Sequence, residues 1–299
     1  MRKTLIVLLG PTGVGKTDLS INIAKALNTE ILSCDSRQIY KELCVGTAVP
    51  EKEYLEMVPH HFIRTISIHD YYNASKFEFE VVDLLKQLFQ TKDQVLMTGG
   101  SMMYIDAVCK GIDDLPTIDP EIRSNLKERL DKEGLESLWI ELKRLDPEYY
   151  HKVDLKNGKR VLHALEVCYM TGKTFTSFRK NIVKKRDFDI LKIGLNRDRE
   201  ELYNRINQRV ELMIQDGLIE EARSVYDHRY LNSLNTVGYK ELFQHFDGNI
   251  SLQEAIDLVK RDSRRYARKQ LSWFRRDKEI HWFHADEAEK IIEFIKETV

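Results

Sequence analysis

The chain is poor in cysteine and lacks long apolar runs. Its 299 residues include four cysteines, at positions 34, 44, 109 and 168, and no two of them form a C-x-x-C pair. This spacing argues against a disulfide framework or a zinc site and favours buried thiols in a reducing compartment. No stretch approaches the roughly 20 apolar residues of a membrane-spanning helix. We therefore expect a soluble, cytoplasmic protein with no membrane association.

An excess of charge of one sign is also missing. The formal net charge is −1, so the chain as a whole has no nucleic-acid signature and any basic surface must be local. One segment has that character: residues 260–278 contain nine basic residues against two acids, with Tyr266, Trp273 and Phe274 interleaved. Such a segment is typical of contact with a phosphate backbone, with aromatics available for stacking. A calmodulin-type or acidic protein partner is the less favoured alternative.

The first twenty residues carry the strongest motif. An apolar strand over residues 4–9 is followed by GPTGVGKT and then by an amphipathic helix. This order fits the phosphate-binding loop G-x-x-x-x-G-K-[ST], in which glycines let backbone N–H groups surround an anion, a lysine adds charge and a hydroxyl ligates Mg²⁺. An ordinary strand-to-helix turn is the disfavoured alternative. The loop residues predicted to bind a diphosphate or a triphosphate are Gly10, Pro11, Thr12, Gly13, Val14, Gly15, Lys16 and Thr17.

Three further residues are candidates for a ligand site. Asp35 ends a predicted strand over residues 30–35, and the carboxyl ends of parallel strands share one edge of a sheet. It is a candidate Mg²⁺ ligand or general base, or merely a turn aspartate. Arg205 and Arg209 are i, i+4 neighbours on a predicted helix over residues 200–215. They either point at one anion or pair with Glu201 and other acids.

The remaining pattern predicts an α/β fold. Apolar strands over residues 94–100, 188–195 and 280–283 join the first two in a P-loop NTPase-like parallel sheet flanked by helices. Residues 121–172 read as almost wholly helical, which indicates an inserted all-helical domain. The predicted division is a core of residues 1–115 and 187–299 and an insertion of residues 116–186. A capping box at Ser251 opens a long basic helix, predicted to continue through residue 278.

Some local patterns leave alternatives open. Lys156, Lys159, Arg160 and His163 have helical spacing, so they form either an RNA-contacting face or an ordinary solvated one. Adjacent His60 and His61 should point in opposite directions, which disfavours a shared metal ion. The pair Gly99-Gly100 fits either close approach to a ligand or a tight turn.

Ten stretches, in order along nearly the whole chain, resemble the tRNA dimethylallyltransferase family. They are GPTGVGKT, DSRQIY, GTAVP, PHHFI, YNASKF, GGSMMY, KRVLHALEV, RINQRVELM, TVGYKE and RYARKQLSWFR. The phosphate loop alone is shared with many nucleotide enzymes. The combination of DSRQIY, PHH, GYKE and ARKQLSWFR is much more specific.

The resemblance implies transfer of a dimethylallyl group from its diphosphate to N6 of the adenosine 3′ of the anticodon, in tRNAs that read codons beginning with U. Asp35 would be the base, helped by Lys16, Thr17, Ser101 and Arg209, with Mg²⁺ on Thr17. A monomer that binds dimethylallyl diphosphate and the anticodon stem-loop is expected. The implied tRNA-binding residues are Asp35, Ser36, Arg37, Gln38, Ser101, Arg123, Lys159, Arg160, His163, Gly238, Tyr239, Lys240, Arg268, Lys269, Gln270, Trp273 and Arg275.

The chain departs from the family pattern in three places. Met102 stands where the family usually has glycine in G-G-T-G-L-Y, and Lys159 and His163 replace a glutamine and an arginine. The change at Met102 affects how the prenyl donor fits. The changes at Lys159 and His163 affect one tRNA contact. The alternative functions are a P-loop small-molecule or nucleotide kinase, which leaves the basic helix unexplained, and a non-catalytic RNA-binding protein.

Overall fold

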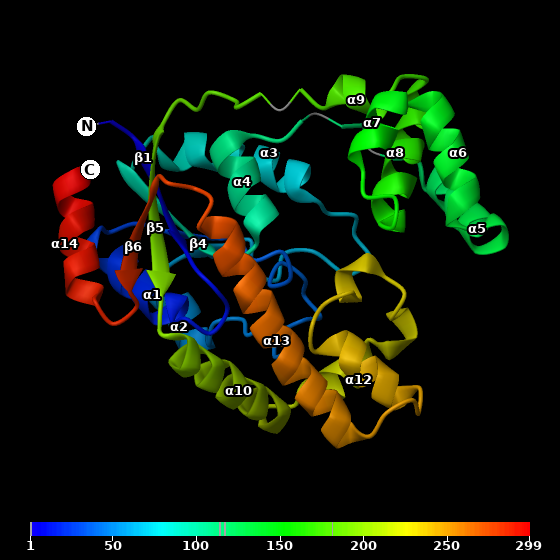
Figure 1. The fold of residues 1–299 in the computed structure, drawn as a ribbon. Helices are drawn as coiled ribbons and strands as arrows, with labels where there is room; N and C mark the ends of the chain where they lie inside the picture. Colours follow the sequence, from blue (N-terminus) through cyan, green and yellow to red (C-terminus); the bar gives the residue numbers. More distant parts are fainter. Residues whose placement is uncertain (1, 114, 117, 181) are drawn as a thin grey trace. The chain divides into compact units, whose positions relative to one another are not determined.

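The computed structural model describes residues 2–113, 115–116, 118–180 and 182–299, which form two units (Figure 1). Unit 1 comprises Met1–Cys109 and Lys185–Val299, and unit 2 comprises Lys110–Lys184. The insertion thus begins at Lys110 and ends at Lys184, where the sequence pattern had suggested residues 116 and 186.

Unit 1 is built on a parallel sheet, as predicted. Its six strands lie in the order β3-β2-β4-β1-β5-β6, and all their pairings are parallel. Strand β1 lies inside the sheet, with Leu9 in register with Gly99 on one side and Gly194 on the other. The edge strand β3 was not predicted, because two half-buried histidines carry no apolar alternation. The strands are β1 (Thr4–Leu9), β2 (Ile31–Ser33), β3 (His60–His61), β4 (Gln94–Gly99), β5 (Asp189–Asn196) and β6 (Ile280–His284).

Helices cover both faces of this sheet, because β1 is apolar on both sides. Leu5, Val7 and Leu9 face one core, and Ile6 and Leu8 face the other. The first core includes residues of α3 (Ala74–Leu88), α4 (Met102–Lys110), α11 (Leu218–Ser224), α12 (Tyr239–Phe246) and α13 (Leu252–Phe274). The second includes residues of α1 (Lys16–Ala26), α10 (Arg199–Gln215), α13 and α14 (Ala288–Thr298), with Tyr54 of the short α2 (Lys52–Met57) packed against it.

Helix α13 is shorter than predicted. The Ser251–Glu254 capping box opens it as expected, but it ends at Phe274, with Arg275 as its C-cap. The prediction of a helix through residue 278 was wrong, because basic residues alone gave no signal for its end. The last basic residues of the segment therefore lie beyond the helix.

The regular secondary structure in the described residues of unit 2 is all helical. It has its own apolar core, in which Leu138, Leu142, Val161 and Leu165 are fully buried. Helix α8 begins at Gly158, with the Asn157 side chain as its N-cap, so Lys156 precedes the helix and does not share its predicted basic face. The helices are α5 (Pro120–Glu133), α6 (Leu135–Leu145), α7 (Pro147–Lys152), α8 (Gly158–Thr171) and α9 (Phe175–Phe178).

Within the part of the chain that the structure describes, no helix has both the length and the apolar character required to cross a membrane.

Candidate active site

The phosphate loop connects β1 to α1 at the carboxyl end of the sheet. Gly13 and Gly15 have φ of 79° and 105°, a left-handed conformation that favours glycine, and Gly15 is the N-cap of α1. The loop therefore presents the helix N-terminus to the cavity in front of it, where an anion is favoured. Lys16 folds over the loop, and its Nζ donates to the carbonyl oxygens of Gly10 (3.0 Å) and Pro11 (2.8 Å).

Two arginines of α10 approach the same loop. Arg205 Nε donates to the Gly13 carbonyl (3.0 Å), and Arg209 Nη1 donates to Thr12 Oγ1 (3.3 Å). Among the described residues, neither has a carboxylate within salt-bridge distance, and Glu201 pairs with Arg197 instead. This geometry favours the first of the two alternatives, an anion held by both arginines.

The positive charge at this site is poorly compensated. Burial and the neighbouring Arg209 lower the pKa of Lys16 to about 8, against the opposing effect of Asp35. Burial also lowers the pKa of Arg209. A cation held in this way becomes more stable when an anion arrives, so the site is electrostatically prepared for a phosphate group.

Asp35 follows β2, and its two carboxylate oxygens have different surroundings. Its Oδ1 accepts the backbone N–H groups of Arg37 (2.8 Å) and Gln38 (3.3 Å), so the turn-aspartate alternative is correct for this oxygen. No hydrogen bond to Oδ2 occurs among the described residues. The turn thereby orients a carboxylate whose second oxygen is available to a substrate.

Two cavities meet at Asp35. A larger one, of about 550 Å³, is lined by the phosphate loop with Lys16, Thr17 and Arg205. A smaller one, of about 270 Å³, has an apolar wall and polar groups from Ser36, Arg37, Ser101 and Lys240. Both cavities are lined by Thr12, Asp35, Arg209 and Tyr266. A molecule in the phosphate cavity and a molecule in the smaller cavity can therefore approach each other beside Asp35.

Tyr266 is a site residue that the sequence analysis missed. It was recognised only as an aromatic on the basic helix, whereas the structure places it in both cavities. Burial raises its pKa to about 12, with a further contribution from Asp35, so the phenol keeps its proton. The missed signal was helical spacing: Val259, Ser263, Tyr266 and Gln270 form one face of α13.

The DSRQIY segment forms the wall between the cavities. Ser36 N–H donates to Ser101 Oγ (2.8 Å), which ties this segment to the start of α4. Gln38 Nε2 donates to the carbonyls of Thr47 (3.1 Å) and Ala48 (2.9 Å). Of the three residues after Asp35, Ser36 and Arg37 line the smaller cavity and Gln38 lines the larger one.

Gly99 and Gly100 line the larger cavity directly. Gln270 Nε2 donates to the Gly100 carbonyl (2.8 Å), and Thr12 N–H donates to Gln270 Oε1 (2.9 Å), so one amide joins this strand end to the phosphate loop. A Cβ would collide with Cys34 at Gly99 and with Gln270 at Gly100, so close packing within the protein already requires both glycines. Met102 is the first residue of α4 and has no positive φ, so it replaces the family glycine without backbone strain.

Three of the predicted tRNA-binding residues on α12 and α13 are engaged inside the protein. Gln270 is 2% exposed and holds the phosphate loop, and Tyr239 is fully buried with its hydroxyl on Glu221 (2.6 Å). Half-buried Trp273 donates to Asp106 (2.8 Å). The prediction for Tyr239 and Gln270 is corrected, because neither side chain reaches the surface. Gly238 and Lys240 line the smaller cavity, and Arg268, Lys269 and Arg275 are exposed.

Unit 2 uses two of its predicted RNA contacts internally. Arg123 Nε lies 2.9 Å from Glu166 Oε1, and His163 Nδ1 lies 3.2 Å from Glu166 Oε2. Glu166 is 6% exposed, so both side chains serve a buried carboxylate. They remain 31% and 41% exposed, and their assignment as RNA contacts stays a prediction. Lys159 and Arg160 are exposed.

The two adjacent histidines have separate partners. His60 Nδ1 faces the Val58 carbonyl (2.7 Å), and His61 Nε2 faces Glu30 (2.7 Å). No group of three His, Cys, Asp or Glu side chains suited to a metal occurs in the described ranges. The two side chains thus bond in separate places, as expected for neighbours in an extended segment.

Comparisons with known proteins agree with the resemblance. The model of the IPP transferase family matches residues 38–277. The tRNA dimethylallyltransferase 1 of Bacteroides fragilis (strain YCH46) is 60% identical over 297 residues, covering 99% of each chain. The tRNA dimethylallyltransferase of Christiangramia forsetii is 49% identical, covering 100% of this chain and 99% of its own.

Solved structures show the same fold. The full-length tRNA isopentenylpyrophosphate transferase from Bacillus halodurans superposes with a TM-score of 0.72 at 33% identity, covering 99% of this chain and 96% of its own. A eukaryotic dimethylallyltransferase acting on tRNA has a TM-score of 0.79 at 23% identity, which supports the fold alone. By the family model and these whole-length relatives, the chain belongs to the tRNA dimethylallyltransferase (IPP transferase) family.

Proposed function

We propose that this protein is a prenyltransferase that moves a dimethylallyl group from dimethylallyl diphosphate to N6 of the adenosine 3′-adjacent to the anticodon, in tRNAs that read codons beginning with U. Diphosphate is released. The observation that carries the proposal is the meeting of a cationic phosphate cavity and a second cavity beside Asp35. Family membership supports this reaction and gives no support to the kinase alternative.

The larger cavity is the proposed donor site. Breaking the allylic C1–O bond leaves its electron pair on the diphosphate, where negative charge develops. The loop N–H groups, Lys16, Arg205 and Arg209 surround that position and need little rearrangement to stabilise the charge. The donor's phosphates would draw Lys16 away from the Gly10 and Pro11 carbonyls.

The smaller cavity is the proposed adenine site. A base inside an RNA loop reaches such a cavity only by leaving its stack. The new bond joins N6 to C1 of the prenyl group, and one N6 proton passes to Asp35, whose free Oδ2 is suited to accept it. An aromatic amine is a weak nucleophile, so orientation by Ser36, Arg37 and Ser101 should matter as much as proton removal.

Mg²⁺ is proposed as the cofactor. The Thr17 hydroxyl faces the larger cavity, and Thr98 Oγ1, a buried hydroxyl with no partner among the described residues, belongs to a residue of the same cavity. Mg²⁺ typically takes few protein oxygens and completes its shell with waters and substrate phosphates, which fits this donor set. When bound, the ion would neutralise charge on the diphosphate. Thr17→Ala should raise the Mg²⁺ concentration that half-saturates donor binding, whereas Thr17→Ser should not.

The tRNA is proposed to bind through exposed basic groups. Arg268, Lys269 and Arg275 supply such groups on unit 1, and Lys159 and Arg160 on unit 2. We also propose that the protein acts as a monomer in the cytoplasm, since its candidate active site is formed within one chain and all four cysteines are free thiols. Light scattering on the purified protein tests the monomer.

The deciding experiment incubates the protein with dimethylallyl diphosphate, Mg²⁺ and an anticodon stem-loop, with mass spectrometry of the product nucleosides. We expect a prenylated adenosine in the loop, and none from a stem-loop with purine riboside at that position, because it lacks the N6 amine. Hydrolysis of ATP without RNA, together with no prenyl transfer, would support the kinase instead.

A further inference from the structure

A column of cations and aromatic rings is formed by residues of α11, α12 and the segment that follows α11. The Arg223 guanidinium lies 3.7 Å from the Phe246 ring centroid, and Phe246 meets Tyr226 edge to face at 5.4 Å. Arg229 lies between two rings, 4.3 Å from Tyr226 and 4.6 Å from Tyr230. The column ends at Tyr230, which is 81% exposed. We call these five residues the stacked column.

The stacked column is anchored at Tyr226 and Arg229. The Tyr226 hydroxyl donates a hydrogen bond to the Asp247 carboxylate. Arg229 Nε lies 3.9 Å from the same carboxylate. The neighbouring helical turn, η1 (Tyr226–His228), brings His228 against His69, with ring centroids 4.5 Å apart. The Tyr230 ring is therefore held in place from one side, while most of its surface faces solvent. A ring fixed in this way loses little conformational entropy when a flat ligand stacks on it.

The stacked column is close in the chain to residues that line the smaller cavity. Only a short turn, η2 (Asn232–Leu234), separates Tyr230 from Asn235 and Thr236, which line that cavity. Arg37, another lining residue, donates to the carbonyls of Asn232 (3.2 Å) and Ser233 (3.1 Å). In Figure 1 this yellow segment precedes α12, whose first residues also line the cavity. The turn that follows Tyr230 is thus hydrogen-bonded to a residue of the cavity wall.

We propose that the stacked column is a platform on which an unpaired base of the tRNA loop stacks, next to the adenosine that enters the cavity. The proposal rests on the proposed function, which brings an RNA loop to the smaller cavity. Aromatic rings and guanidinium groups are the surfaces that proteins use for splayed-out single-stranded bases. Since every base has a stackable face, the platform would steady the loop without selecting its sequence. A protein partner would also favour tyrosine and arginine, and the experiment separates the two.

The test measures binding of a fluorescein-labelled anticodon stem-loop without donor. We expect Tyr230→Ala to bind about tenfold more weakly, within the range of base–aromatic stacking, and Tyr230→Phe to bind like the wild type. Phe79→Ala is the matched control, because Phe79 is 74% exposed on α3 of the same unit. Thermal unfolding should be the same for all four proteins, since both side chains are on the surface.

Stem-loops with a single abasic loop position identify the stacked base. One abasic position should weaken binding to the wild type but not to Tyr230→Ala, a non-additivity expected of two groups in contact. Equal RNA affinity of wild type and Tyr230→Ala would overturn the platform, as would additive effects at every loop position. In that case a wild type that still prenylates the stem-loop leaves the proposed function intact. A wild type that neither binds nor prenylates it refutes both.

Discussion

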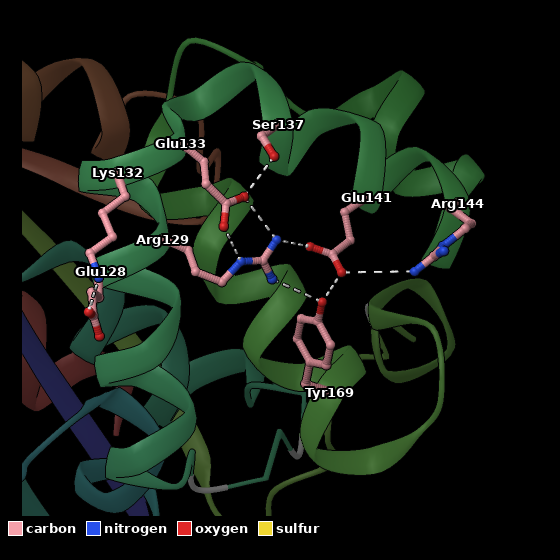
Figure 2. Close-up of polar contacts among 8 residues, drawn as sticks. All are labelled: Glu128, Arg129, Lys132, Glu133, Ser137, Glu141, Arg144 and Tyr169. Atoms are coloured by element: carbon pink, nitrogen blue, oxygen red, sulfur yellow. Dashed lines mark hydrogen bonds and ion pairs between the residues drawn. The ribbon is translucent and has the colours of Figure 1, made fainter.

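Charged side chains are used differently in the two units. At the active site, Lys16, Arg209 and Asp35 have no oppositely charged group within salt-bridge distance among the described residues, and burial lowers the pKa of both cations. In unit 2, Arg129 lies between Glu133 (3.0 Å) and Glu141 (2.9 Å), with Tyr169 beside it (Figure 2). Its hydrogen bonds to the two glutamates raise the pKa of Arg129.

The difference separates charges that wait for a ligand from charges that join helices. A buried cation without a counter-charge costs free energy in the empty protein, and that cost is removed when an anion binds. A cation between two carboxylates already has its counter-charge and has little to offer a substrate. The site cations should therefore affect binding with little effect on stability, and Arg129 should do the reverse.

The largest expected effect is at Asp35. Asp35→Asn keeps an oxygen for the Arg37 and Gln38 N–H groups, and so keeps the turn, but it cannot accept the N6 proton. We expect single-turnover prenyl transfer to fall by about 10²–10⁴, the usual contribution of a general base. RNA and donor affinity should change little. Transfer at the wild-type rate would exclude Asp35 as the base.

The second effect is on donor binding. Lys16→Ala should weaken binding of dimethylallyl diphosphate about 10- to 100-fold, the range for a hydrogen bond from a charged donor. Calorimetric titration without RNA measures it. Thermal stability should stay the same or rise, since a desolvated charge is removed. Arg129→Ala is the control from unit 2, with unchanged donor affinity and a lower unfolding temperature, and a reversed pattern would refute the comparison.

The third effect concerns a residue first assigned to tRNA. Arg123→Ala should lower the free energy of unfolding by about 1–3 kcal/mol, because buried Glu166 loses its guanidinium partner. Burial alone would raise the pKa of Glu166, but hydrogen bonds from His163 and Arg123 hold it below its usual value. Urea unfolding measures the loss. Exposed Lys159→Ala is the control, with a change within about 0.5 kcal/mol. An equally stable Arg123→Ala with weakened RNA binding would favour the RNA contact over the structural role.

Much of the fold could be predicted because its signals are local. Strand β1, the glycine loop and α1 follow from apolar runs and a motif of fixed spacing, and the Ser251–Glu254 cap was visible in four letters. The end of α13 was less predictable, since charged residues fit a helix, its cap or a loop equally well.

The site was predicted as a set of residues but not as a geometry. Resemblance identified Gln270 and Tyr239 as important, yet assigned them to tRNA, because a motif does not reveal which way a side chain points. Their burial depends on contacts from distant segments: Gln270 reaches Thr12 and Gly100, and Tyr239 reaches Glu221. The same limitation hid Tyr266, whose role emerges only where two cavities meet.

The smallest expected effect is the pH dependence of donor binding. Lys16 is charged in the empty protein only below a pKa of about 8, and a bound diphosphate favours the charged form. Binding should therefore take up a proton above this pH, and affinity should fall by at most about tenfold per pH unit as the pH rises past 8. Calorimetry in buffers of different ionisation enthalpy detects that proton. Lys16→Arg should remove the dependence, because arginine stays charged.

Stability of the empty protein should change in the opposite direction: the pKa of Lys16 is lower than in the unfolded chain, so its contribution to stability rises between pH 8 and about 10.5. Affinity that fell while stability rose over one pH range would identify Lys16 as a cation kept for the substrate, and a flat affinity would refute that role.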